Sequence, residues 1–123
     1  MNKSESKSLS GTQLVDTIIS SLKEKLAEDI VLVDMQNARG TADWFIICQG
    51  DNTSHTSSIA DGVVNSLKEH NTRPWHQEGT EDGRWILIDY TDVVLHIMLP
   101  ELREYYDLES LWSEGSIQKI STH

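Results

Sequence analysis

The sequence predicts a single α+β domain, with a mixed sheet of about five strands and helices mainly on one face. Two stretches repeat apolar side chains every third or fourth residue, as amphipathic helices do, and five short apolar runs have the length of strands. In chain order the elements follow the pattern αββαβββα. At 123 residues the chain has room for one domain with a modest core.

The domain is expected to occupy residues 9–113, between two polar ends. Residues 1–8 are rich in Ser, Lys and Glu, so we expect a disordered tail there; they match neither a secretory signal nor a transit peptide. Residues 114–123 show no periodicity and are expected to form a C-terminal tail. No apolar run has the length of a membrane span, so a cytoplasmic protein that does not enter the membrane is the default expectation.

The first helix is expected to begin at Ser10, whose hydroxyl can cap it, with Gln13 completing a capping box. The apolar stripe of this helix comprises Leu14, Val15, Ile18, Ile19, Leu22 and Leu26. A stripe of this kind packs on a sheet far more often than it binds a partner, so it predicts a core helix.

Two strands and a second helix follow. Residues 30–34 form a short β-branched run, residues 36–41 predict a polar turn, and residues 44–48 are apolar on both strand faces, as a central strand is. Asn52 can cap the second helix. Residues 75–78 then predict a short third strand.

The stretch from 78 to 112 carries the main site signal. Its two strand-like runs, 85–89 and 93–99, each present one purely apolar face. The other face mixes apolar side chains with a carboxylate and an imidazole; it holds Trp85, Leu87, Asp89, Val94, His96 and Met98. Such a mixed face favours a partner-binding surface. The alternative is a sheet buried on both sides, with an Asp–His contact inside.

We therefore predict a partner-binding surface with apolar anchors at its centre and acidic groups around it. The anchors are expected to be Trp85, Leu87 and Met98, with His96 beside them. Asp89 and Glu78 can pair with Lys or Arg of a partner. Tyr105 and Tyr106, on a short helix beginning at Pro100, are expected to extend the surface.

Charge narrows the class of partner. The chain carries a formal net charge of -10 and has a pI of about 4.7. It therefore repels phosphate backbones, and direct sequence-specific nucleic-acid binding is not expected. A basic protein is the favoured partner. The single cysteine, Cys48, cannot form an intramolecular disulfide and is expected to be a buried thiol.

Signals for an enzyme are sparse. The sequence contains no GxGxxG, P-loop or HExxH motif, and no D-x-D pair lies in an expected strand. None of the histidines is paired with another at metal-ligand spacing, so no metal, cofactor or catalytic residue is expected. A small nucleotidyltransferase or its accessory protein remains the alternative function. A third interpretation is an interaction module whose open sheet self-associates.

The residues resemble the ribosomal silencing factor family, also called Iojap, over about residues 14–112. Six pieces occur in the family's order: 29–34 (DIVLVD), 42–47 (ADWFII), 50–61, which ends in SIAD, 78–79 (EG) with Trp85 and Asp89, 93–98 (VVLHIM) and 103–112 (REYYDLESLW). Two positions depart from the family pattern. Asn52 replaces a Ser, and both residues cap helices. Thr91 replaces a turn Gly and tolerates positive φ poorly, so a turn of different shape is expected.

The resemblance implies a fold like that of nucleotidyltransferases, without their catalytic apparatus. It also implies a translational repressor that is not an enzyme. Such a protein would bind the large ribosomal subunit through the basic protein numbered fourteen on the intersubunit face, and would sterically block joining of the small subunit. From strand phase we further expect the free protein to form a homodimer through the same mixed face.

Overall fold

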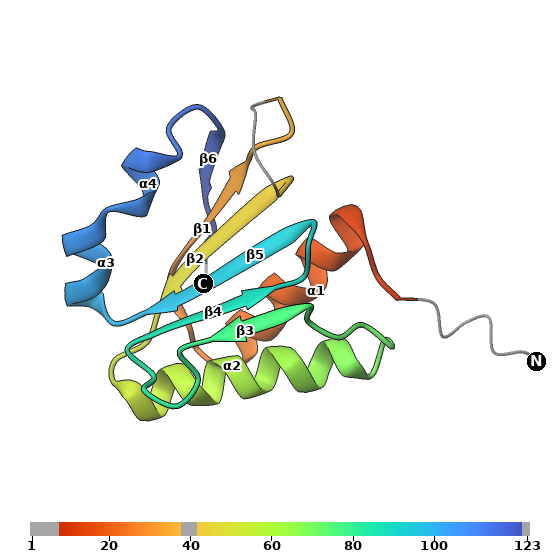
Figure 1. The fold of residues 1–123 in the computed structure, drawn as a ribbon, viewed down its shortest axis with the longest axis horizontal. Coiled ribbons are helices and arrows are strands. Elements are labelled where there is room, and N and C mark those ends of the chain that lie inside the picture. Colours follow the sequence, from red (N-terminus) through yellow and green to blue (C-terminus); the bar gives the residue numbers. More distant parts are fainter. Residues whose placement is uncertain (1–7, 38–41, 122–123) are drawn as a thin grey trace, which may run out of the picture.

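The described residues of the computed structural model, 8–37 and 42–121, form one six-stranded sheet with four helices (Figure 1). In chain order the elements are α1 (Gly11–Glu24), β1 (Glu28–Asp34), β2 (Trp44–Gln49), α2 (Thr53–Lys68), β3 (His76–Glu78), β4 (Trp85–Asp89), β5 (Val93–Met98), α3 (Pro100–Tyr106), α4 (Leu108–Leu111) and β6 (Ser116–Lys119). The predicted α+β class with a mixed sheet is confirmed. Residues 1–7 of the expected N-terminal tail, and 38–41 of the expected turn, lie outside the described residues.

The strands lie in the order β3-β4-β5-β2-β1-β6. Among these described strands β2 and β5 form the one parallel pair, and the other neighbours are antiparallel. The sequence predicted about five strands, and the sixth is β6, which lies within the expected C-terminal tail. β6 pairs with β1, and the Ile120 N–H donates to the Ile30 carbonyl at 2.9 Å. All four β6 residues are exposed, which is why they carry no apolar alternation.

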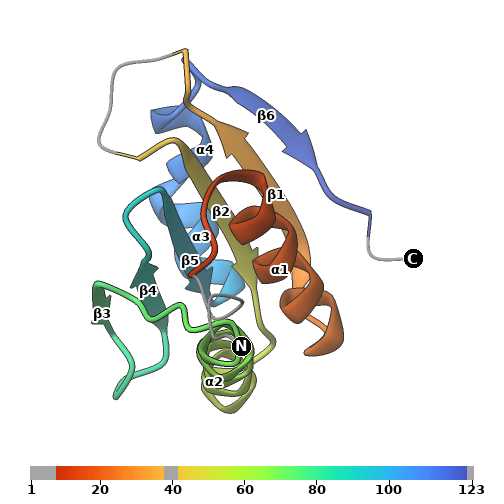
Figure 2. The same ribbon diagram turned by 90° about the vertical axis from the view of Figure 1, so that its right-hand side faces the viewer.

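Helices α1 and α2 cover one face of the sheet and enclose the main core (Figure 2). The apolar stripe predicted for α1 is buried at Leu14, Ile18 and Leu22, whereas Leu26 lies beyond the helix and is exposed. The centre of this core comprises Leu14, Ile18, Leu22, Ile46, Ile59, Val63, Leu67, Ile86, Ile88, Leu95 and Ile97.

The two predicted helix caps differ in outcome. The Asn52 side chain accepts a hydrogen bond from the His55 N–H at 2.9 Å, so this cap is confirmed. The predicted capping box at Ser10 is wrong, because the Ser10 side chain caps no N–H among the described residues of α1. Gly11 there has a φ of +59°, and Ser10 itself is extended.

Helices α3 and α4 lie against the opposite face of the sheet, toward one end (Figures 1 and 2). Leu108 of α4 packs there with Ile47 and Met98. Trp112, just after α4, stacks on Phe45 of β2 with ring centroids 3.9 Å apart. The larger helices thus lie on one face, as predicted, and the small ones partly close the other.

Two tight backbone positions shape the hairpins on either side of β4. A Cβ on Gly79 would collide with the Trp85 carbonyl, so only glycine fits beside the start of this strand. Thr91, between β4 and β5, has a φ of +79°. The expected change of turn shape does not follow from the substitution, since Thr91 takes the left-handed region that glycine favours.

Candidate protein-binding surface

We call the sheet surface opposite α1 and α2 the open face. Strand pairing places Glu78 opposite Leu87, and His76 opposite Asp89, so these four side chains share it. Glu78 and His76 are exposed, whereas Leu87 and Asp89 are half-buried. Leu108 and Trp112 of the α3–α4 segment cover the end of β5 and part of β2. One accessible part of the open face lies over β3 and β4, and β6 exposes Ile117 and Lys119 at the other edge of the same face.

Trp85 joins this strand surface to α3. The Trp85 indole N–H donates to His96 Nδ1 at 3.0 Å, and the Trp85 ring lies 4.9 Å from that of Tyr106. Tyr105 packs edge-on against Tyr106, also at 4.9 Å, and is 79% exposed. We call Trp85, Tyr105 and Tyr106 the aromatic ridge. The ridge brings three predicted site residues together on one side of the molecule.

His96 and Met98 are placed differently from the prediction. Met98 is fully buried beneath the α3–α4 segment, in contact with the cluster around Leu108. His96 is 5% exposed and lies among the rings of Phe45, Trp85 and Trp112. The expectation that these two side chains are accessible is wrong, because Leu108 and Trp112 fold back over the strand end and cover it.

Burial also fixes the charge state of His96. It lowers the pKa of the imidazole from 6.5 to about 4, so His96 is neutral at neutral pH. Since Nδ1 accepts the indole N–H of Trp85, the ring proton resides on Nε2. The open face therefore carries a carboxylate and an imidazole as predicted, but the imidazole holds Trp85 in place. The alternative Asp–His contact is replaced by a Trp–His hydrogen bond.

The two predicted acidic residues lie at the part of the open face over β3 and β4. Glu78 Oε2 pairs with His76 Nε2 at 2.7 Å. Asp89 Oδ1 accepts a hydrogen bond from the Thr91 N–H at 2.7 Å, across the turn before β5. Both carboxylates thus stand beside the strand surface, and Asp89 is held by local backbone.

Sequence reasoning missed Trp75 as a surface residue. It lies just before β3, is 75% exposed, and lines a pocket of about 230 Å³ with Asp89, Thr91 and Val94. The signal was a tryptophan next to a three-residue strand that is too short to bury it.

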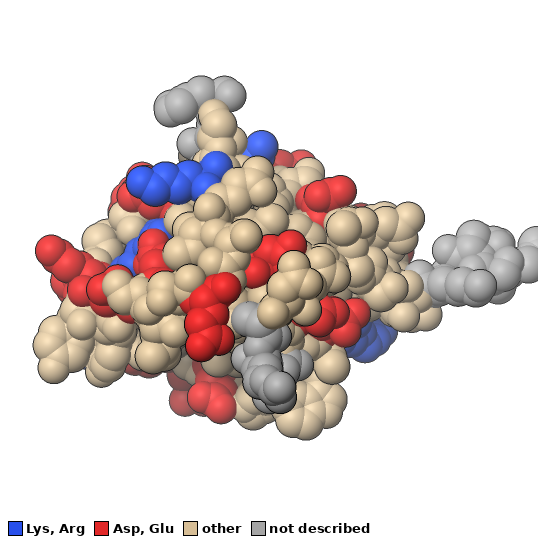
Figure 3. Space-filling view, turned by 90° about the horizontal axis from the view of Figure 1, so that it is seen from above, with Lys and Arg blue, Asp and Glu red and all other residues tan. Residues whose placement is uncertain are grey.

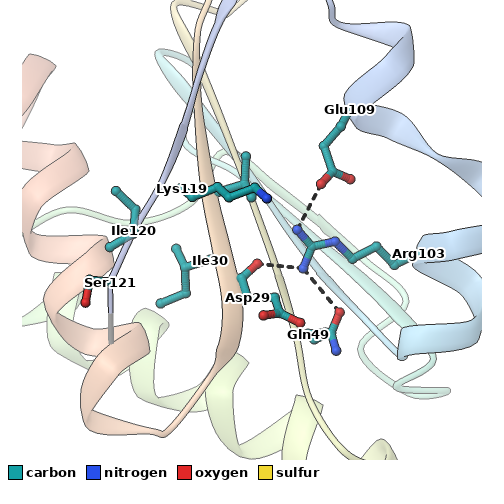
Figure 4. A pocket seen from close by; sticks show the side chains of 9 residues that line it. Asp29, Ile30, Gln49, Arg103, Glu109, Lys119, Ile120 and Ser121 are labelled. Carbon is teal, nitrogen blue, oxygen red and sulfur yellow. Dashed lines mark hydrogen bonds and ion pairs between the residues drawn. The ribbon is translucent and has the colours of Figure 1, made fainter. Parts of the chain in front are cut away.

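The short helix that carries the tyrosines is anchored by Arg103 (Figure 4). Its guanidinium donates to the Asp29 carbonyl at 2.6 Å, to Gln49 Oε1 at 3.3 Å and to Glu109 Oε2 at 3.1 Å. None of the seven described residues of α3 is buried. Arg103 thus links α3 to β1, β2 and α4, beside a cavity of about 560 Å³.

The charge pattern of the molecule matches its composition. Asp and Glu side chains are spread over the face in Figure 3, while Lys and Arg side chains are confined to a few places. Within residues 8–37 and 42–121, no group of three or more His, Cys, Asp or Glu side chains is placed to hold a metal ion. No helix in the same residues is long and apolar enough to cross a bilayer.

Comparison with known proteins gives a consistent result. Residues 8–123 match the family model described as "Ribosomal silencing factor during starvation". The ribosomal silencing factor RsfS of Bacillus subtilis is 35% identical over 97 residues, which span 79% of this chain and 82% of that protein. The protein of the same name from Chromobacterium violaceum is 36% identical over 94 residues, or 76% of this chain and 77% of that one.

A solved structure agrees with the sequence relatives. The crystal structure of a protein from Chromobacterium violaceum superposes with a TM-score of 0.82 at 32% identity, covering 85% of this chain and 88% of that chain. The family model spans nearly the whole chain, and the named relatives are ribosomal silencing factors. The chain belongs to the ribosomal silencing factor family.

Proposed function

We propose that this protein is a translational repressor that binds the large ribosomal subunit and keeps the small subunit from joining it. The contact is with the basic protein numbered fourteen on the intersubunit face. Occupying that position excludes the small subunit sterically, so the mechanism requires binding and no chemical step. Membership of the ribosomal silencing factor family supports this function.

The observation that carries the proposal is the aromatic ridge. Tyr105 and Tyr106 are 79% and 50% exposed on a helix with no buried residue among its described positions, so their rings contribute little to the core. Large aromatic side chains that are rigid and accessible are the usual centre of a protein interface. The Trp85 ring packs against the Tyr106 ring, so the ridge is ordered before a partner binds.

Charge determines the kind of partner that fits around the ridge. The exposed carboxylates of Glu104 and Asp107 flank the two tyrosines, and Glu78 stands on the neighbouring strand surface. With a net charge of -10, the protein is repelled by ribosomal RNA and attracted by a basic protein patch. Steering toward that patch favours a protein contact on the ribosome over an RNA contact.

The free protein is proposed to be a two-fold symmetric homodimer. An exposed aromatic surface is a liability in water, and pairing two copies through the ridge and Leu87 covers it. His96 and Met98 take no part in this contact, since both are buried. Dimerisation and ribosome binding then compete, so apparent affinity for the ribosome falls at high protein concentration. Sedimentation velocity at several concentrations, with and without Tyr106→Ala, tests the dimer.

Co-sedimentation with purified large subunits, small subunits and whole ribosomes tests the function. We expect binding to large subunits only, and fewer whole ribosomes when the protein is present before the subunits are mixed. Tyr105→Ala and Tyr106→Ala should each weaken large-subunit binding by about thirtyfold if they are hot spots. Leu26→Ala, at an exposed apolar residue after α1, is the matched control and should bind normally. Equal binding to both subunits would refute the proposal.

A further inference from the structure

The pocket beside Trp75 lies at the other end of β4 from the aromatic ridge. Trp85 begins β4 and contacts Tyr106, whereas Asp89 ends it and lines the pocket. The two residues are four positions apart along the strand, or about 13 Å. The pocket is therefore a second feature of the open face, and the contacts of the ridge leave it unexplained.

The lining of the pocket combines three kinds of group. The Trp75 indole is 75% exposed. Val94, directly opposite Asp89 in the β4–β5 pairing, is 9% exposed and supplies an apolar wall. Asp89 supplies a half-buried carboxylate whose Oδ1 accepts from the Thr91 N–H; among the described residues Oδ2 has no hydrogen-bond partner. An aromatic ring, an aliphatic wall and a carboxylate thus surround a space of about 230 Å³.

We infer that this pocket receives an arginine side chain of the ribosomal partner protein. A guanidinium group stacks on an indole by cation–π attraction and pairs with a carboxylate through its planar N–H groups. The aliphatic part of the arginine fits the Val94 wall. Phosphate is disfavoured by the Asp89 charge, and a purely apolar group would leave that carboxylate desolvated without a partner. The inference rests on the proposed function, because it gives the basic partner a specific anchoring point.

The turn before β5 prepares the carboxylate for this role. Thr91 has a φ of +79°, which directs its N–H to Asp89 Oδ1 at 2.7 Å. The carboxylate is therefore held in one orientation before any partner arrives. A fixed acceptor loses little conformational freedom on binding, so it distinguishes a guanidinium better than a mobile surface carboxylate does.

The pocket is tested with substitutions that keep the fold. For each variant, the affinity for purified large subunits is measured over a range of salt concentrations. Asp89→Asn keeps the oxygen that accepts from Thr91 and removes only the charge. We expect about tenfold weaker binding and a shallower salt dependence. Trp75→Leu should weaken binding by about threefold, and Trp75→Phe by less, because it keeps a ring. Asp61→Asn, at an exposed carboxylate on α2, is the matched control and should change neither quantity.

The double variant tests whether both groups hold one side chain. If Trp75 and Asp89 contact the same guanidinium, Trp75→Leu combined with Asp89→Asn loses less affinity than the product of the single losses. Single variants that bind like the wild type at every salt concentration would overturn the inference, while the proposed function would stand. A wild-type protein that fails to bind large subunits would overturn the function instead.

A measurement without ribosomes separates these outcomes further. We would titrate isotope-labelled protein with N-acetyl-arginine-amide and follow the Trp75 indole N–H by NMR, with N-acetyl-norleucine-amide as the uncharged control. We expect shifts at Trp75 and Val94 with the arginine compound only, and their loss in Asp89→Asn. Absence of shifts at this pocket would overturn the assignment of its ligand, whatever the ribosome experiment gives.

Discussion

The burial of His96 makes the stability of the domain depend on pH. Burial lowers the His96 pKa from 6.5 to about 4. Between these two pH values His96 binds a proton in the unfolded chain but not in the folded protein. The part of the folding stability that depends on a neutral His96 is fully present above pH 6.5 and is lost as the pH falls toward about 4. This pKa difference corresponds to roughly 3 kcal/mol in the free energy of unfolding.

The variant His96→Gln isolates this contribution from that of the carboxylates. Its amide oxygen can still accept from the Trp85 indole N–H, but it does not titrate. Urea unfolding at pH 7.5 and pH 4.5 should show a larger loss of stability for the wild type than for the variant. Equal losses in both proteins would show that His96 is protonated, or exposed, in the folded state.

Met98 is expected to contribute to folding and to make no direct contact with a partner. It is fully buried with Ile47 and Leu108, so Met98→Ala should lower the free energy of unfolding by about 2–5 kcal/mol. Met98→Leu conserves volume and should cost less than about 1.5 kcal/mol. Urea unfolding measures both. A Met98→Ala protein that is as stable as the wild type but binds large subunits weakly would show that Met98 does contact the partner.

Helix α3 is expected to depend on Arg103 for its position. No residue of α3 is fully buried among its described positions, so Leu102 packs only partly on the cluster around Leu108, and the hydrogen bonds of Arg103 to Asp29, Gln49 and Glu109 supply the polar attachment to the sheet. Arg103→Met should lower the free energy of local opening in residues 100–112 by about 1–3 kcal/mol. Hydrogen exchange read residue by residue measures this opening.

The matched control for Arg103 is Arg84→Met, since Arg84 is exposed and pairs only with the exposed Asp82 among the described residues. This control should leave exchange in residues 100–112 unchanged. Faster exchange throughout the sheet of Arg103→Met would mean that the whole domain is destabilised. Unchanged exchange in α3 would show that the packing of Leu108 and Trp112 is sufficient without the arginine.

The elements that the sequence predicted well are those whose side chains divide cleanly between core and solvent. β4 coincides with the predicted run 85–89, because Ile86 and Ile88 alternate with the less buried Trp85 and Leu87. β6 was not predictable in this way. An edge strand held by backbone hydrogen bonds to β1 requires no apolar pattern, and all four of its side chains are exposed.

The candidate site was predicted in part, and the misses have two physical origins. Tyr105, Tyr106 and Glu78 are exposed and Asp89 is half-buried. Strand phase indicated Asp89, while the tyrosines were expected only as an extension of that surface on the following helix. Whether an apolar side chain such as Met98 is covered depends on where a distant segment folds back, and nothing in the local pattern specifies that. Trp75 shows the reverse case, because its exposure follows from the shortness of the neighbouring strand pair.

The whole molecule is expected to combine electrostatic steering with apolar anchoring on the ribosome. Attraction between a protein of net charge -10 and a basic patch is screened over about 8 Å at physiological ionic strength, whereas contacts of the aromatic ridge are not. Large-subunit binding should therefore weaken with salt yet persist at moderate salt. Tyr106→Ala should lower affinity equally at all salt concentrations. Complete loss of wild-type binding at modest salt would indicate a purely electrostatic contact.

The parallel pairing of β2 with β5 has a consequence for how the chain folds. Two groups of strands are close in sequence and can pair early: β1 with β2, and β3 with β4 and β5. The two groups join into a single sheet only when β5 pairs with β2, and α2, β3 and β4 lie between those strands in the sequence. Closing so long a loop lowers the chain entropy before the contacts between β2 and β5 have formed to offset that cost. We therefore expect Ile46→Val and Ile97→Val to slow refolding, whereas Ile117→Ala in β6 should mainly speed unfolding.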